Sequence, residues 1–271
     1  MTGRNDIGPR LREWRARRKL TQAELAGDSR ISTRHLSFVE TGRSRPSREL
    51  VLRLAERLEL PLRERNSLLF AAGFAAEYPE KPLSGPGLEA MRRAIDAIIK
   101  GHEPYPAFAV DRFWTLVASN GGFHPYMEGI DRSLFPMPLN VLRFTLDPRG
   151  LAPRIANYWQ WRSHMLSKLA RQVLVSNDSA LAKLHRELAA YAPPAEAGRP
   201  DAADQLEASG GFAVPFQLRT PSGEVLSFFS TTTVFGTPIE VTLSEVSLEC
   251  FYPADPATAA ILHTQRALPA R

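Results

Sequence analysis

Residues 21–47 contain a close grouping of side chains that can hydrogen bond to nucleic acid. Within this segment, residues 32–40 have the spacing of a short helix whose exposed side would carry Thr33, Arg34 and Ser37. An arginine can donate two hydrogen bonds to one guanine, so Arg34 is the predicted base-reading residue. Polar and basic side chains around such a helix are suited to contacts with phosphates. The predicted DNA-contacting residues are Gln22, Thr33, Arg34, His35, Ser37, Phe38, Arg43, Arg45 and Ser47.

Two short helices joined by a tight turn are needed to present these side chains. Thr21 with Glu24 three residues later predicts a capping box at the first helix, and Ser32 predicts the N-cap of the second. Apolar residues at the inner positions would hold the two helices together; they are Leu25, Ala26, Ile31, Leu36 and Val39. This arrangement is typical of a helix-turn-helix, whose second helix enters the major groove. Residues 1–76 are therefore predicted to form an all-α domain of five short helices.

The positive charge of the chain is concentrated in this first region. Residues 1–76 carry 16 Lys and Arg against 9 Asp and Glu, whereas the rest of the chain carries 18 against 20. A basic region joined to a nearly neutral one indicates that only the first meets a polyanion. Two alternatives stay open: a basic surface that is merely solvated, and a five-helix module that binds protein.

The first region resembles the lambda-repressor-like (XRE) family of helix-turn-helix proteins. The similarity lies in the TQAELA run at 21–26, the helix at 32–40 and the Gly42-Arg43 exit. Asp28-Ser29-Arg30 occupies the turn where many relatives have a glycine, so Arg30 is expected to adopt the left-handed region. The resemblance implies binding to paired DNA half-sites as a homodimer.

Beyond a Pro- and Gly-rich linker at 77–87, residues 88–267 have a mixed helix and strand pattern. The expected order is one helix, a hairpin at 107–110 and 113–119 joined by Asp111-Arg112, and helices at 139–146, 151–173 and 178–191. A mobile loop at 192–211, three strands at 212–219, 225–235 and 238–251, and a closing helix follow. This order suits one five-stranded antiparallel sheet covered by helices, as in a PAS-like sensor domain. The predicted fold class is therefore α+β.

Aromatic side chains and one cation in this second region could form a pocket for a small apolar acid. On a helix over 151–173, Arg154, Trp161 and Met165 would share one face, so that the arginine could bind a carboxylate at the end of an aromatic stripe. The alternative is that these residues only form the hydrophobic core. The predicted ligand-binding residues are Phe108, Trp114, Arg154, Asn157, Tyr158, Trp161, Met165 and Phe228.

The resemblance of the whole chain narrows to MmyB-like transcription regulators. It is carried by the runs at 34–74, 104–120, 140–162 and 228–255. These regulators join a helix-turn-helix to a PAS-like ligand-binding domain. The resemblance implies small-molecule control of transcription, with a long-chain fatty acid as a known kind of occupant and effector.

Several classes of function find no support in the sequence. One cysteine, Cys250, excludes a disulfide framework, and the six histidines lack ligand spacing, so no metal is expected. Phosphate-loop, H-E-x-x-H and G-x-S-x-G motifs are absent, so neither an enzyme nor a cofactor is expected. The polar N-terminus and the lack of a long apolar run predict a cytoplasmic protein without membrane contact. Two alternatives remain: residues 88–262 as a dimerisation or protein-interaction platform without a ligand, and an enzyme fused to a DNA-binding domain.

Overall fold

The computed structural model describes residues 7–83, 85–198 and 214–267. Internal contacts divide the chain into two compact units, and each is described by itself. The first comprises Met1–Pro82 together with Thr237–Ser244, and the second comprises Leu83–Gly236 and Glu245–Arg271. No helix within the described ranges is long and apolar enough to cross a membrane. The part of the predicted 192–211 loop that begins at residue 199 lies outside the described residues.

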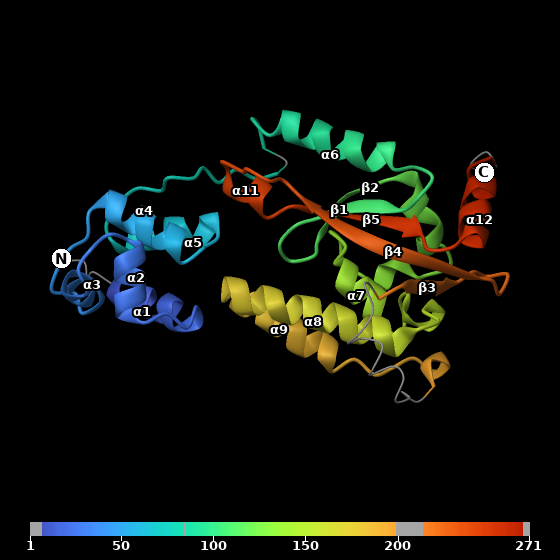
Figure 1. Ribbon diagram of the computed structural model, residues 1–271. Helices are drawn as coiled ribbons and strands as arrows, with labels where there is room; N and C mark the ends of the chain where they lie inside the picture. Colours follow the sequence, from blue (N-terminus) through green and yellow to red (C-terminus); the bar gives the residue numbers. More distant parts are fainter. Residues whose placement is uncertain (1–6, 84, 199–213, 268–271) are drawn as a thin grey trace. The chain divides into compact units, whose positions relative to one another are not determined.

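Five short helices form the body of the first unit (Figure 1), as predicted. Its core includes Leu11, Leu25, Leu36 and Leu54, each with no exposed surface. Burial of a leucine side chain contributes about 1.5–3 kcal/mol relative to exposure, so this cluster provides the main cohesion of the unit. The helices are α1 (Ile7–Arg17), α2 (Gln22–Asp28), α3 (Thr33–Glu40), α4 (Arg48–Arg57) and α5 (Leu62–Ala71).

Side-chain caps set the starts of α2, α3 and α4. The predicted box is present at α2, where the Thr21 side chain accepts from the Glu24 backbone and the Glu24 carboxylate accepts from the Thr21 backbone. Ser32 and Ser47 cap α3 and α4 through their hydroxyl groups. Arg30 has a φ of 55°, so the non-glycine turn adopts the predicted left-handed conformation.

The segment that follows α5 stays attached to the first unit. The Asn66 amide donates to the carbonyl of Tyr78 and accepts from the backbone N–H groups of Glu77 and Tyr78. Helix α11 (Val241–Ser244) joins the same unit, because the Val241 N–H donates to the Pro79 carbonyl at 2.9 Å. The buried Glu240 carboxylate accepts from the Lys81 N–H at 2.9 Å and from the Leu243 N–H at 2.8 Å.

A five-stranded antiparallel sheet organises the second unit, with the strand order β2-β1-β5-β4-β3. This order confirms the predicted α+β, PAS-like fold. Strand β1, which lies between β2 and β5, is buried along its whole length because helices cover both faces of the sheet. The strands are β1 (Ala107–Val110), β2 (Leu116–Ser119), β3 (Phe216–Arg219), β4 (Val225–Val234) and β5 (Ser247–Pro253).

Helix α6 covers one face of this sheet, and α7, α8 and α9 lie on the other side (Figure 1). Met91, Ile95 and Ile99 of α6 are buried, whereas Ile98 is 41% exposed. The helices of this unit are α6 (Glu89–Gly101), α7 (Val141–Leu146), α8 (Tyr158–Ser176), α9 (Ser179–Ala189) and α12 (Pro256–Ala267). Short 3-10 helices connect them: η1 (Gly121–Met127), η2 (Arg132–Leu134), η3 (Ala152–Arg154) and η4 (Ala195–Ala197).

The helix predicted over 151–173 is confirmed from Tyr158 onward but is wrong at its start, because the helical path is interrupted between η3 and α8. Ile155 forms a β-bridge with Leu218, and the Ala156 N–H donates to the Gln217 carbonyl at 2.8 Å. These hydrogen bonds to β3 hold the backbone extended, and the same backbone groups are then not available for the hydrogen bonds within a helix. Arg154 consequently lies outside α8 and does not share a helical face with Trp161.

Two strand predictions also differ from the structure in their details. The connection between β1 and β2 spans 111–115, because the Asp111 carboxylate accepts from the N–H groups of Phe113 and Thr115 and stabilises a longer turn. The strand predicted over 238–251 begins only at Ser247. Glu240 accepts from the Leu243 N–H at 2.8 Å and starts the short helix α11 instead.

Candidate nucleic-acid interface and ligand pocket

Helix α3 presents the side chains predicted to contact bases. Leu36 and Val39 are fully buried and fix its inner face. Thr33 and Arg34 are exposed, and His35, Ser37 and Phe38 are partly exposed. The Arg34 guanidinium lies 5.3 Å from the centre of the Phe38 ring. This cation–π contact restricts the orientation of the Arg34 side chain.

A buried charge network holds α3 against α1 and α2. The Glu40 side chain has no exposed surface, and its Oε1 accepts from Arg15 Nε at 2.7 Å. Its Oε2 accepts from Arg15 Nη2 at 3.0 Å and from Gln22 Nε2 at 2.8 Å. Burial opposes ionisation, but the hydrogen bonds from Arg15 and Gln22 outweigh it, so the pKa of Glu40 lies below its ordinary value.

Some of the side chains predicted to contact phosphates already form hydrogen bonds within the protein, and others are exposed to solvent. Gln22 directs its amide to Glu40, so that side chain positions α2 against α3 in this structure. Ser47 accepts from the Leu50 N–H at 3.3 Å and serves as a helix cap. Arg43 and Arg45 are exposed just beyond α3. Contacts of these residues with DNA stay a prediction.

An apolar pocket lies in the core of the second unit, between the sheet and the helices α7 and α8. About 640 Å³ of space between atoms lies within it, including the part open to solvent. The lining residues are Pro106, Phe108, Trp114, Phe123, Tyr126, Val141, Leu142, Phe144, Thr145, Leu151, Trp161, Met165, Phe216, Phe228, Glu249 and Phe251.

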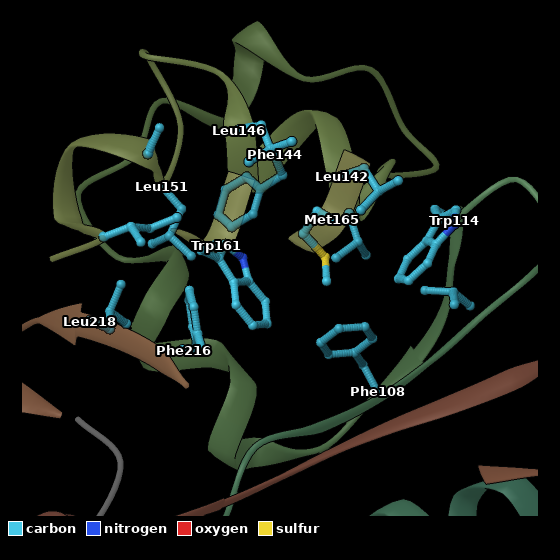
Figure 2. Packing of buried hydrophobic residues seen from close by; sticks show 14 of the residues in the cluster. Phe108, Trp114, Leu142, Phe144, Leu146, Leu151, Trp161, Met165, Phe216 and Leu218 are labelled. Atoms are coloured by element: carbon cyan, nitrogen blue, oxygen red, sulfur yellow. The ribbon is translucent and has the colours of Figure 1, made fainter. Parts of the chain in front are cut away.

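The structure brings most of the predicted aromatic residues together around this space. Figure 2 shows the Trp161 indole between Phe216 and Met165, with Phe108 close to the same space. The Trp161 and Phe216 ring centres are 4.7 Å apart. The predicted residues that line the pocket are Phe108, Trp114, Trp161, Met165 and Phe228.

Three predicted ligand-binding residues have other positions. Arg154 Nη2 donates to the Glu128 carbonyl at 2.6 Å and is not among the residues that line the pocket. Asn157 donates to the Pro215 carbonyl and accepts from the Gln217 N–H, so it joins the start of α8 to β3. Tyr158 is 2% exposed and belongs to the core cluster rather than to the pocket lining.

Several lining residues were not singled out from the sequence. Phe123 and Tyr126 belong to η1, a segment without a regular apolar period. On β5, Glu249 and Phe251 face the pocket, and Leu248 and Cys250 alternate with them and are also buried. Successive side chains of a strand point to opposite faces of the sheet, so Glu249 and Phe251 face the pocket while Leu248 and Cys250 face the other side. With the correct start of β5, this alternation would have predicted that Phe251 lines the pocket.

Polar groups at the pocket are few. The Trp161 Nε1 and the Tyr126 hydroxyl are both buried, and neither has a hydrogen-bond partner among the residues that the structure describes. Burial raises the pKa of Tyr126, so its hydroxyl stays protonated near neutral pH. Glu249 Oε1 accepts from Lys168 Nζ at 2.8 Å and from the Thr232 hydroxyl at 3.0 Å.

The part of the second unit that the structure describes has no arrangement suited to metal chemistry. Among the described residues, no group of three or more His, Cys, Asp or Glu could hold a metal ion. Burial, with a smaller effect of Glu249, raises the pKa of the Cys250 thiol. A protonated thiol is a poor nucleophile.

The two units together define a class of protein. A helix-turn-helix with an exposed recognition helix is joined in one chain to a PAS-like domain with an apolar pocket, and this combination characterises ligand-responsive transcription regulators. The chain matches the MmyB-like transcription regulator ligand binding domain over residues 91–264 and a helix-turn-helix domain over residues 6–68. The first match covers more than half of the chain, so the protein belongs to the MmyB-like transcription regulators. Both matched domains are regulatory modules rather than enzymes.

Other comparisons add little. No curated protein matches the chain. One similar solved structure is described as an RNA-binding Light-Oxygen-Voltage receptor, with 13% identity and a TM-score of 0.21. The match covers 98% of this chain but only 63% of that receptor chain. At this level of similarity, the receptor carries no argument about function.

Proposed function

We propose that this protein is a cytoplasmic transcription regulator that binds operator DNA as a homodimer and responds to a long-chain ligand of the fatty-acid type. The observation that carries the ligand proposal is the pocket in the second unit. Its lining consists almost entirely of aromatic and aliphatic side chains, which suit a hydrocarbon chain. Each methylene group buried there would contribute about 0.8 kcal/mol to binding.

The DNA half of the proposal rests on α3. Its exposed N-terminal residues Thr33 and Arg34 have the position from which recognition helices contact base edges. Arg43 and Arg45, which are exposed just beyond α3, would contact the phosphate backbone of the same site. In a dimer, two such helices would lie about 34 Å apart to enter successive major grooves, so a small change in their spacing would alter the affinity for DNA.

Residues 237–244 offer a covalent route from the ligand to the DNA-binding unit. This segment belongs to the first unit by its contacts, yet it connects β4 and β5 of the second unit. Phe228 on β4 and Phe251 on β5 line the pocket. A ligand that shifts these strands would move Glu240 and Val241, which are bound to the backbone at Lys81 and Pro79. This is a two-state coupling in which occupancy changes the preferred spacing of two DNA-binding units.

Extraction and mass spectrometry of the purified full-length protein test the ligand, and fluorescence anisotropy with operator DNA tests the response. We expect an apolar long-chain compound to copurify and its removal to change the affinity for DNA. Leu142→Trp would fill the pocket, and Leu174→Trp, at an exposed position of α8 outside the pocket lining, serves as a matched control. An affinity for DNA that does not change with any extracted compound would contradict the sensor function.

A further inference from the structure

Two hydrogen-bond donors at the pocket have no partner within the described ranges of the chain. Trp161 is 3% exposed, and its Nε1 has no partner among the described residues. An indole N–H can only donate, so this atom requires an acceptor. The Tyr126 hydroxyl is in the same situation, and its ring lies 6.1 Å from that of Phe228. Buried polar groups without partners are rare in folded proteins, and two of them at one apolar pocket indicate a ligand atom that completes them.

The charges around the pocket oppose an ionised ligand. Glu249 is the one charged residue among the described lining residues, and it is 3% exposed. Its nearest cation, Lys168, already donates to Glu249 and to Thr232. His164 packs against Trp161 with ring centres 5.5 Å apart, and burial, with the nearby Lys168 and Arg171, lowers its pKa, so it is neutral at pH 7. Arg154 and Arg162 donate to the carbonyls of Glu128 and Ala189.

We propose that the pocket selects a ligand whose polar group is an uncharged hydrogen-bond acceptor, such as a ketone, an ester, a lactone or a protonated acid, bound by Trp161 Nε1 and the Tyr126 hydroxyl. This inference rests on the proposed function, because it concerns the same pocket. A carboxylate would lose its hydration without gaining a free cation, and it would share the pocket with Glu249. A neutral carbonyl loses much less hydration, and its oxygen can accept a hydrogen bond from either donor.

Three probes of equal chain length separate these possibilities: 2-dodecanone, dodecanoic acid and dodecane. Each is titrated into the full-length protein at pH 7.5 in competition with a fluorescent apolar dye. We expect the ketone to bind most tightly, with an affinity about tenfold or more above that of the ionised acid, because only the acid must bury a charge. Dodecane should bind more weakly than the ketone, because it leaves both donors without a partner.

Tyr126→Phe tests the role of the hydroxyl. The replaced group has no partner in the structure, so the variant is expected to fold as the wild type does. We expect the preference for the ketone over dodecane to fall about 2- to 10-fold, with no change in the affinity for dodecane. Tyr105→Phe is the matched control, because the Tyr105 hydroxyl contacts His263 and Tyr105 does not line the pocket.

The outcomes are distinguishable. Binding of all three probes with equal affinity, or tighter binding of the acid, would overturn the neutral-acceptor inference and leave the apolar-ligand function intact. An unchanged preference in Tyr126→Phe would also refute the assigned donor. Failure of every probe to displace the dye would instead overturn the proposed function, together with the inference that rests on it.

Discussion

Glu40 provides a demanding prediction about the DNA-binding unit, because its side chain joins three helices. Glu40→Gln keeps the shape of the side chain but removes the charge and points an amide N–H₂ group at other donors. The carboxylate has no exposed surface, and it receives two hydrogen bonds from Arg15, at 2.7 and 3.0 Å, and one from Gln22, at 2.8 Å. Removal of one partner from a buried ion pair costs about 3–5 kcal/mol.

A cost at or somewhat below the lower end of this range applies here. The Arg15 side chain is 15% exposed, so water partly solvates the cation that remains. We therefore expect Glu40→Gln to reduce the stability of α1–α3 by about 2–3 kcal/mol. Since 1.4 kcal/mol corresponds to a factor of ten, opening of these helices should become about 30- to 150-fold more frequent.

Amide hydrogen exchange with peptide-level mass spectrometry measures this opening in the full-length protein. Peptides from α1 and α3 should exchange faster in the variant, whereas peptides from α8 should not change. Glu13→Gln is the matched control, because the Glu13–Arg17 pair is exposed at 3.1 Å and such pairs contribute about 0–1 kcal/mol. If α3 exchanged less than about threefold faster in Glu40→Gln, the buried network would not stabilise the unit.

The same network has a defined pH dependence. The pKa of Glu40 in the folded state lies below its ordinary value of 4.5, so its contribution is fully present above that value. The contribution is lost as the pH falls through the lowered pKa. The difference in exchange between wild type and Glu40→Gln should therefore shrink below about pH 4.5. A difference that stayed constant down to pH 3 would show that the charge of Glu40 is not the cause.

Three further predictions concern function. Arg34→Ala should relax base preference, whereas Arg43→Ala should weaken binding to all DNA sequences and reduce the dependence of affinity on salt concentration. Fluorescence anisotropy on operator and mismatched DNA measures both effects. Equal loss of discrimination between the two DNAs in both variants would contradict these roles. Glu240→Ala removes the acceptor for two backbone N–H groups, so the protein should still bind its ligand in dye displacement but show a smaller ligand effect on DNA affinity. Met165→Trp should occupy part of the pocket and lower the affinity for a twelve-carbon ligand more than for a six-carbon one; equal losses for both lengths would argue against a chain lying beside Met165.

The helix-turn-helix could be predicted from the sequence alone. Thr21, Glu24 and Ser32 act on backbone groups within three residues of themselves. The left-handed turn at Arg30 likewise follows from local backbone geometry. Interactions within one helical turn join residues that are close in the sequence, so they can be predicted from the sequence alone. For the same reason, the exposed side of α3 could be assigned before the structure was known.

The lining of the pocket could not be predicted in the same way, because it depends on contacts between segments that are far apart in the sequence. Bonds from Ile155 and Asn157 to β3 interrupt the predicted helix and take Arg154 away from the aromatic stripe. Tyr126 lines the pocket from the 3-10 helix η1, and no apolar periodicity in that segment predicts this position. The sequence by itself determined the five short helices, three of them with side-chain caps, and most of the order of strands and helices, because those signals are local. Only the tertiary structure decided which aromatic residues surround the pocket and which donors remain unpaired there, because both depend on which distant backbone groups compete for the same hydrogen bonds.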